Sequence, residues 1–218
     1  MNNNLEKTST KQRILDSATE LFATKGYTET TIRELAAVVG VKEASIYNHF
    51  PSKNAILESI LGEYAEEIVI GFVDYGKISI LEKNPTVDGI MSCMEFRFPE
   101  GREEYFLKQL YVILQEQHRN PTVRKFMCEQ IILTTEHIFR TIVIKLKESR
   151  ILRPDTDPDF WARINASLIY TFSSRRLLGI GDNAPDFSGK GLFELLRNVY
   201  GFMLQMCHVE NDGITGAH

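Results

Sequence analysis

Residues 31–53 of this 218-residue chain read TIRELAAVVGVKEASIYNHFPSK. Thr31 and Glu34 have the spacing of a capping box, in which two side chains satisfy free N–H groups of a first helical turn. Gly40 ends this helical pattern, and glycine readily adopts the positive φ that reverses a chain between two helices. Ala36 lies four residues before Gly40, and Ile46 lies six residues after it. This spacing predicts a helix-turn-helix with a small residue where the helices cross and an apolar residue beneath them.

The outer face of the second helix, residues 43–49, decides what such a motif does. In a DNA-binding helix-turn-helix this face enters the major groove, which is about 12 Å wide. The same spacing also fits an ordinary hairpin of two helices, and the Ala-x-x-x-Gly pattern alone does not separate the two alternatives.

Helical patterns extend over almost the whole chain. Ser9 and Gln12 form a further capping box before a helix that ends near Lys25, and Pro51-Ser52 precedes a long helix from Lys53 to Val73. Residues 74–84 have the composition of a loop. Further helical patterns are predicted over residues 87–96, 105–118, 121–150, 160–178 and 192–206, with Asn120-Pro121 and Asp157-Pro158 as two helix starts. The sequence therefore predicts an all-α fold of about nine helices.

Residues 10–60 resemble the TetR family of bacterial transcription regulators. The resemblance is carried by Ile14-Leu15-Asp16, Ala18, Leu21-Phe22, Lys25-Gly26-Tyr27, Thr30 to Ala36, Gly40-Val41, Ala44 to Phe50, Pro51-Ser52-Lys53 and Leu57. It implies a three-helix DNA-binding domain over residues 1–56 and a larger helical domain for ligand binding and dimerisation over residues 57–218. The helix that starts near residue 53 connects the two and is expected to transmit the signal.

The resemblance also implies contacts with the DNA backbone. Tyr47 and Lys53 match positions that hold phosphates in the proteins that this chain resembles, and a phenol and an ammonium are both suited to that role. Thr31 matches another such position, where the start of a helix offers N–H groups to a phosphate. Simple capping is the alternative role for Thr31, and the two roles are compatible. For Tyr47 the alternative is packing in the core.

Base recognition is expected from the second helix of the motif. A lysine can contact guanine, a serine several base edges, and an alanine the methyl group of thymine. Many relatives carry serine where this chain has Lys42, so the cap of the recognition helix is missing or different here. Glu43 either accepts a hydrogen bond from cytosine or points sideways, and we favour the second. The candidate base readers are Lys42, Glu43, Ala44, Ser45, Asn48 and His49, and Lys7, Lys11 and Arg13 are candidates for further backbone contacts.

The net charge of −4 is unusual for a protein that binds DNA. Residues 1–56 contain 7 basic and 6 acidic residues, whereas residues 57–218 contain 18 basic and 23 acidic residues. The acidic excess therefore belongs to the second predicted domain and does not exclude DNA binding. Residues 1–56 carry a net charge of only +1 (7 basic minus 6 acidic), which predicts that a few well-placed contacts, doubled by dimerisation, carry most of the DNA affinity.

Several protein classes are not supported by the sequence. The start of the chain lacks the apolar segment of a secretory signal, and no apolar run has the length of a membrane span, so we expect a cytoplasmic protein without a membrane partner. Cys93, Cys128 and Cys207 are far apart, and no cysteine or histidine spacing is typical of a metal site. Gly179 and Gly181 lie in a loop without the strand that a dinucleotide fingerprint requires. We expect no cofactor, no metal and no enzymatic activity.

Residues from about 75 onward carry no second motif. The last two predicted helices have wide apolar surfaces, which we expect to form a four-helix interface between two chains. The interface residues are predicted to be Trp161, Ile164, Leu168, Leu192, Leu195, Leu196, Val199, Phe202 and Met203. Aromatic and histidine side chains either line an effector pocket or only fill the core: Phe96, Tyr105, Tyr111, His118, His137 and Tyr170.

These features together predict a homodimeric, sequence-specific regulator that binds double-stranded DNA at a palindromic operator. It is expected to be a repressor that a small, largely apolar ligand releases from DNA. Two alternatives stay open at this point: a DNA-binding protein without an effector, and a helical enzyme whose active site is not recognised.

Overall fold

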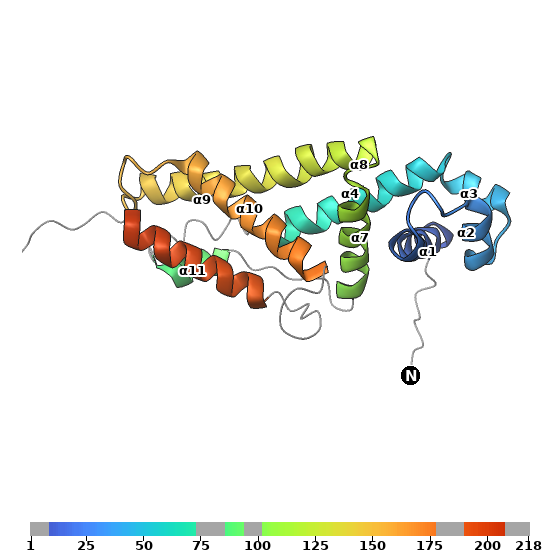
Figure 1. The fold of residues 1–218 in the computed structure, drawn as a ribbon, viewed down its shortest axis with the longest axis horizontal. Coiled ribbons are helices and arrows are strands. Elements are labelled where there is room, and N and C mark those ends of the chain that lie inside the picture. Colours follow the sequence, from blue (N-terminus) through green and yellow to red (C-terminus); the bar gives the residue numbers. More distant parts are fainter. Residues whose placement is uncertain (1–8, 73–85, 94–101, 178–189, 208–218) are drawn as a thin grey trace, which may run out of the picture. The chain divides into compact units, whose positions relative to one another are not determined.

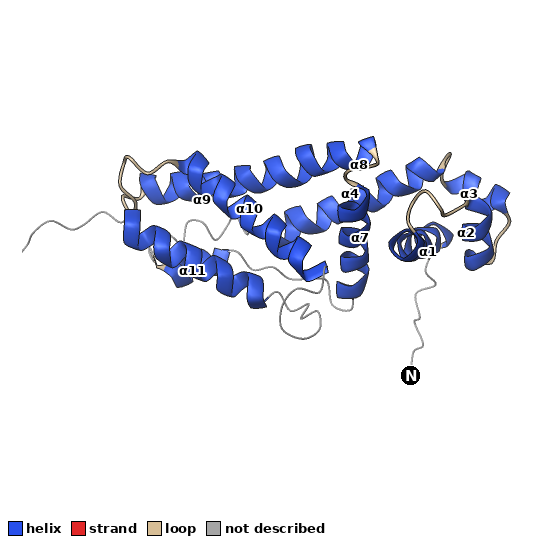
Figure 2. Ribbon diagram, in the orientation of Figure 1, coloured by secondary structure: helices blue, strands red, loops and turns tan. Residues whose placement is uncertain are grey.

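The computed structural model describes residues 9–72, 86–93, 102–177 and 190–207. These residues form helices joined by turns, and no β-strand is present among them (Figure 1, Figure 2). The described part contains nine helices if α8, η2 and α9, which follow one another without a break, are counted as one. The predicted all-α fold is confirmed.

The chain divides into two compact units, which are described separately. Unit 1 comprises Met1–Ile68 and Phe98–Gln130, and unit 2 comprises Val69–Arg97 and Ile131–His218. The division into functional domains at residue 56 stays a prediction. The helices are α1 (Thr10–Lys25), α2 (Ile32–Val39), α3 (Glu43–His49), α4 (Lys53–Phe72), α6 (Val87–Cys93), α7 (Glu103–Glu116), α8 (Pro121–Phe126), η2 (Met127–Ile132), α9 (Leu133–Glu148), α10 (Pro158–Leu177) and α11 (Lys190–Cys207).

Local signals place the first helices of unit 1. The Ser9 hydroxyl accepts the Gln12 N–H at 3.1 Å, and the Thr31 hydroxyl accepts the Glu34 N–H at 3.2 Å. Gly40 adopts φ +76°, a left-handed conformation that favours glycine, and it ends α2. The buried apolar side chains in this part of the chain include Ile14, Leu15, Ala18, Phe22, Leu35, Ala36, Val39, Ile46, Phe50, Ile56, Leu57, Ile60 and Leu61.

Helix α7 joins this core from later in the sequence. It packs against α1, where the ammonium of Lys108 lies 2.5 Å from a carboxylate oxygen of Glu20. The ring of Phe106 stacks on the ring of Tyr64 in α4, with 4.6 Å between the ring centroids. Both α1 and α4 are therefore in contact with α7 within unit 1.

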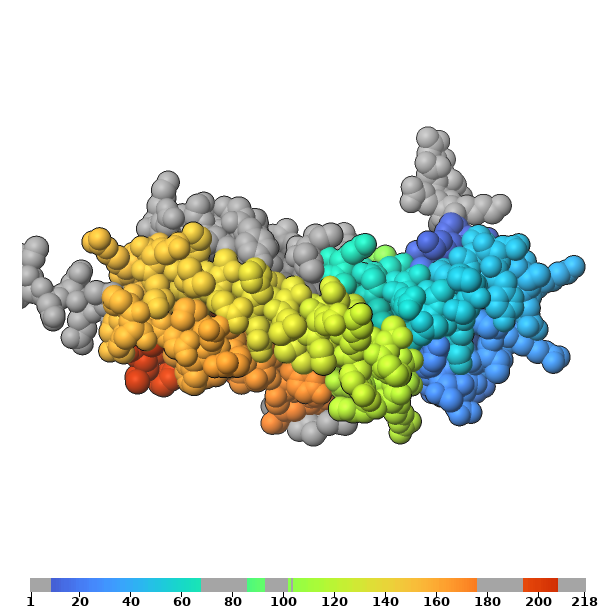
Figure 3. All heavy atoms as spheres, turned by 90° about the horizontal axis from the view of Figure 1, so that it is seen from above, coloured from blue at the N-terminus to red at the C-terminus, as the bar shows by residue number. Residues whose placement is uncertain are grey.

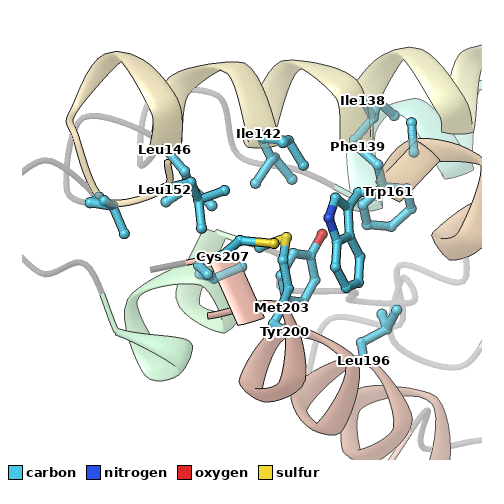
Figure 4. Packing of buried hydrophobic residues seen from close by; sticks show 14 of the residues in the cluster. Ile138, Phe139, Ile142, Leu146, Leu152, Trp161, Leu196, Tyr200, Met203 and Cys207 are labelled. Atoms are coloured by element: carbon cyan, nitrogen blue, oxygen red, sulfur yellow. The ribbon is translucent and has the colours of Figure 1, made fainter. Parts of the chain in front are cut away.

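Unit 2 is organised around α9, α10 and α11. Side chains from α9 and α11 meet Trp161 of α10 in one apolar cluster (Figure 4). In the space-filling view α9 and α10 lie side by side (Figure 3). The Asp157 carboxylate accepts the backbone N–H groups of Asp159 at 2.9 Å and Phe160 at 3.3 Å, so the predicted start of α10 is confirmed.

The helical run from Pro121 to Glu148 departs from the sequence prediction. Its start is as predicted, because the Asn120 side chain accepts the N–H groups of Thr122 and Val123 and Pro121 takes the first helical position. The apolar pattern predicted an uninterrupted helix, whereas residues Met127–Ile132 form a π-helical segment. In the part of the chain that the structure describes, no helix has the length and apolar character needed to cross a membrane.

Candidate nucleic-acid interface

The helix-turn-helix holds α3 by a small number of interactions. Ile46 is the buried residue of α3, and Phe50 directly after the helix is also buried. The Arg13 guanidinium of α1 donates to the carbonyl oxygen of Val39, at the end of α2. Lys25 and Glu34 form an ion pair at 2.8 Å between the end of α1 and the first turn of α2. These contacts hold α1 and α2 together, and the residues of α3 other than Ile46 are exposed or half-buried.

The predicted base readers share the outward side of α3. Glu43, Ala44, Asn48 and His49 are exposed, as is Lys42 directly before the helix, and Ser45 is half-buried. Tyr47 is 51% exposed, so its side chain lies largely at the surface, whereas the alternative assigned it to the core. The structure therefore brings all seven of these predicted residues to one short helix, around a single buried side chain.

The start of α3 lacks a side-chain cap. Lys42 occupies the capping position, and no side-chain hydrogen bond is made there. The Ser45 N–H donates to the Lys42 carbonyl oxygen at 2.8 Å, which closes a tight first turn. The prediction that the usual cap is missing is confirmed.

The two remaining predicted backbone contacts, Thr31 and Lys53, have partners within the chain. Thr31 is exposed and caps α2 through its hydroxyl. The ammonium of Lys53, at the start of α4, donates to carbonyl oxygens in the α1–α2 loop. Partial burial lowers the pKa of Lys53, while the carboxylates of Glu116 and Glu29 act in the opposite direction. A DNA contact from Lys53 would compete with these interactions.

The chain matches a known family over this region. Residues 14–60 fit the family model described as "Bacterial regulatory proteins, tetR family". Residues 14–60 therefore form a helix-turn-helix domain of the TetR type. A relative, the "Biofilm operon icaADBC HTH-type negative transcriptional regulator IcaR" of Staphylococcus aureus strain Newman, is 26% identical over 170 residues, which are 70% of this chain and 88% of the relative. Together the family model and this relative support a transcriptional regulator of the TetR type with a helix-turn-helix.

Solved structures show the same fold over nearly the whole length. The flavonoid-responsive regulator FrrA matches with a TM-score of 0.62 and 19% identity, over 92% of this chain and 98% of that one. A protein from Saccharomonospora viridis in complex with choline matches with a TM-score of 0.61 and 19% identity, again over 92% and 98% of the two chains. The likeness extends the TetR-type fold to the residues that the family model does not cover.

The predicted effector residues are divided between the two units. In unit 1, the Tyr105 hydroxyl donates to Glu63 of α4 at 2.7 Å and accepts from Thr19 of α1 at 3.4 Å. Burial is the main cause that raises the pKa of Tyr105. Tyr111 is half-buried on α7 and His118 is exposed after it, whereas His137 and Tyr170 are exposed in unit 2. Phe96 lies outside the described residues, and a common pocket for these side chains stays a prediction.

The predicted dimer residues fall into two sets. Trp161, Leu196 and Met203 are buried in the core of unit 2, so they have little surface left for a partner. Ile164, Leu168, Leu195 and Val199 are half-buried, Phe202 is 56% exposed, and the side chain of Leu192 lies outside the described part. An apolar groove of about 650 Å³ runs between α10 and α11, and its lining includes Phe160, Trp161, Ile164, Val199, Phe202 and Met206.

Some contacts that shape the interface have no signal in the sequence. Arg13 and Lys53 each reach a carbonyl oxygen that lies 26 residues away in the chain. Glu116, which is buried at the end of α7, accepts the N–H of Tyr27 from 89 residues away. No local pattern could identify such pairs. Within the described ranges, no group of three or more His, Cys, Asp or Glu residues is arranged to hold a metal ion.

Proposed function

We propose that the protein is a homodimeric repressor that binds a palindromic operator through α3 and is released by a small, largely apolar molecule. The observation that carries the proposal is the outward side of α3, which presents exposed polar and small side chains next to the buried Ile46. The relative IcaR is named a negative regulator, which supports repression. The absence of a motif for catalysis in the sequence supports a role in binding and not in enzymatic chemistry.

Each side chain on α3 has a contact suited to its chemistry. The Tyr47 phenol donates to a phosphate oxygen, and the Lys42 ammonium contacts a guanine edge. Ala44, Ser45, Asn48 and His49 face the base edges, and Glu43 points sideways. Thr31 places the first N–H groups of α2 toward a phosphate while its hydroxyl caps the helix.

Dimerisation uses the groove between α10 and α11. A second copy of the chain covers the exposed Phe160, Phe202 and Met206, since a large apolar surface of this kind marks an interaction site. A two-fold axis then presents two α3 helices to half-sites about 34–36 Å apart, one turn of DNA.

The effector acts by stabilising a conformation in which the two α3 helices no longer match the operator. FrrA is named flavonoid-responsive, and the Saccharomonospora viridis structure contains choline, so two proteins of this fold are linked to small molecules. The candidate pocket residues are Phe96, Tyr105, Tyr111, His118, His137 and Tyr170. A compound that releases the wild-type protein from DNA should release the Tyr111→Ala variant only at a higher concentration.

The DNA contact is tested with the hydroxyl of Tyr47. A duplex of about 30 base pairs is selected from a random pool with the wild-type protein, and binding is measured by fluorescence anisotropy. Tyr47→Phe should bind it at least tenfold more weakly, because a hydrogen bond to a charged group contributes about 1.5–3 kcal/mol. Thr141→Val on α9, which also removes a hydroxyl group, is the control and should bind as wild type does. Equal binding by both variants, or failure to select any duplex, would contradict the proposal.

A further inference from the structure

Lys53, the first residue of α4, directs its ammonium group into the α1–α2 loop. Its nitrogen donates to the carbonyl oxygens of Tyr27 at 2.7 Å, Thr30 at 2.8 Å and Thr28 at 3.3 Å. A lysine ammonium has three N–H donors. The three carbonyl groups of this one loop therefore take the full donor capacity of Lys53.

Groups around the Lys53 ammonium stabilise its positive charge. The Tyr27 ring lies beneath it, with 4.4 Å between the nitrogen and the ring centroid. Glu116 of α7, which is only 6% exposed, accepts the N–H of Tyr27 at 3.4 Å and lies near enough to oppose the effect of burial on Lys53. The loop is thus held between the start of α4 and the end of α7.

The loop in turn sets the start of α2. Thr30 is buried, and its hydroxyl donates to the Gly26 carbonyl oxygen at 2.9 Å. Thr31, the next residue, caps α2, and α2 packs against α3. A displacement of the Thr30 carbonyl group therefore moves the residue that begins α2, and with it the framework that carries α3.

We infer that Lys53 is a positioning residue, which holds the α1–α2 loop and thereby orients α2 and α3 on DNA, and that its charge does not neutralise a phosphate. The resemblance to the TetR family implied a backbone contact at this position, whereas the donors are already used within the chain. The inference rests on the proposed DNA-binding function and assigns a different task to one of its residues.

The salt dependence of DNA binding separates the two roles. Each phosphate that a protein neutralises contributes about 0.9 to the slope of log K against log salt, so a contact made twice in a dimer contributes about 1.8. On the selected duplex, Lys53→Met should lower affinity about tenfold at every KCl concentration without changing the slope. Lys11→Ala, at an exposed candidate backbone contact on α1, is the comparison and should reduce the slope by about 1.8. A similar reduction for Lys53→Met would overturn the inference.

Arginine at position 53 gives a second test. It keeps the positive charge and binds phosphate well, but its planar group cannot direct three donors toward three carbonyl oxygens around one point. Lys53→Arg should therefore bind as weakly as Lys53→Met. Recovery of wild-type affinity and slope by Lys53→Arg would indicate a phosphate contact and contradict the inference.

A measurement without DNA tests the loop itself. In Lys53→Met the amides of Gly26 and Tyr27 should exchange hydrogen about tenfold faster than in wild type, while the amides of α10 stay unchanged. Unchanged exchange at Gly26 and Tyr27 would refute the inference whatever the DNA result. If the wild-type protein binds no duplex, the proposed function fails, and the exchange rates still decide the role of Lys53.

Discussion

Replacing Phe202 with serine should weaken self-association of the protein. The Phe202 side chain is 56% exposed at the groove between α10 and α11. A phenylalanine side chain has about 200 Å² of surface, so about 110 Å² is available to a partner, and a symmetric dimer contains this residue twice. If the partner covers half of that area on each copy, then at about 25 cal/mol per Å² the two side chains together contribute about 2–3 kcal/mol to the free energy of dimerisation. The dimer dissociation constant should then rise about 30- to 150-fold.

Trp161 provides the assay, because it is the only tryptophan in the chain and its ring centroid lies 6.4 Å from that of Phe202. Its fluorescence is followed as the protein is diluted, and sedimentation equilibrium gives the mass of each species. Leu133→Ser is the matched control, since Leu133 is 57% exposed on α9 and does not line the groove. An unchanged dissociation constant in Phe202→Ser, or an equal change in both variants, would refute the groove as the dimer interface.

Three further predictions concern the fold. Gly40→Ala should lower the free energy of unfolding by about 1–2 kcal/mol, because φ is +76° at this position. Gly62→Ala within α4 should instead raise the free energy of unfolding by about 0.5–1 kcal/mol. Both changes are measured by urea denaturation. Asn120→Ala should cost about 1 kcal/mol in the same assay through loss of the α8 cap. Burial raises the pKa of Glu67 above its usual 4.5. The stability of the wild-type protein should therefore fall as the pH rises from 4.5 through that raised pKa. Denaturation measured at several pH values should show that Glu67→Gln lacks this fall.

Each of these has an outcome that would count against it. A loss of stability in both glycine variants would show that a general effect of the added methyl group, and not the left-handed backbone, is responsible at Gly40. An Asn120→Ala variant as stable as wild type would mean that Pro121 and packing alone begin α8. Parallel pH profiles for wild type and Glu67→Gln would mean that another group titrates in that range.

The sequence predicted the features that depend on neighbouring residues. The caps at Ser9, Thr31, Asn120 and Asp157 and the reversal at Gly40 were all placed correctly, because each involves groups within a few residues of one another. The exposed side of α3 followed from the same periodicity.

Features that depend on distant segments were not predictable. The carbonyl partners of Lys53 and the hydroxyl partners of Tyr105 come together only when α1, α4 and α7 have packed. The π-helical segment Met127–Ile132 was also missed, because its apolar spacing differs little from that of an α-helix over so short a range. The family resemblance implied which side chains contact DNA, but it did not indicate that Lys53 donates to carbonyl oxygens within the chain.

Because so few residues of α3 are buried, regulators of this type can change their DNA specificity without changing their fold. Only Ile46 of its seven residues is buried, and helices of this length are not stable alone. The fold therefore constrains one position and leaves its neighbours open to substitution at little cost in stability. After a gene duplication, changes at these open positions can give the two copies different operator preferences while both retain the same scaffold, so divergence of DNA specificity need not pass through unstable intermediates.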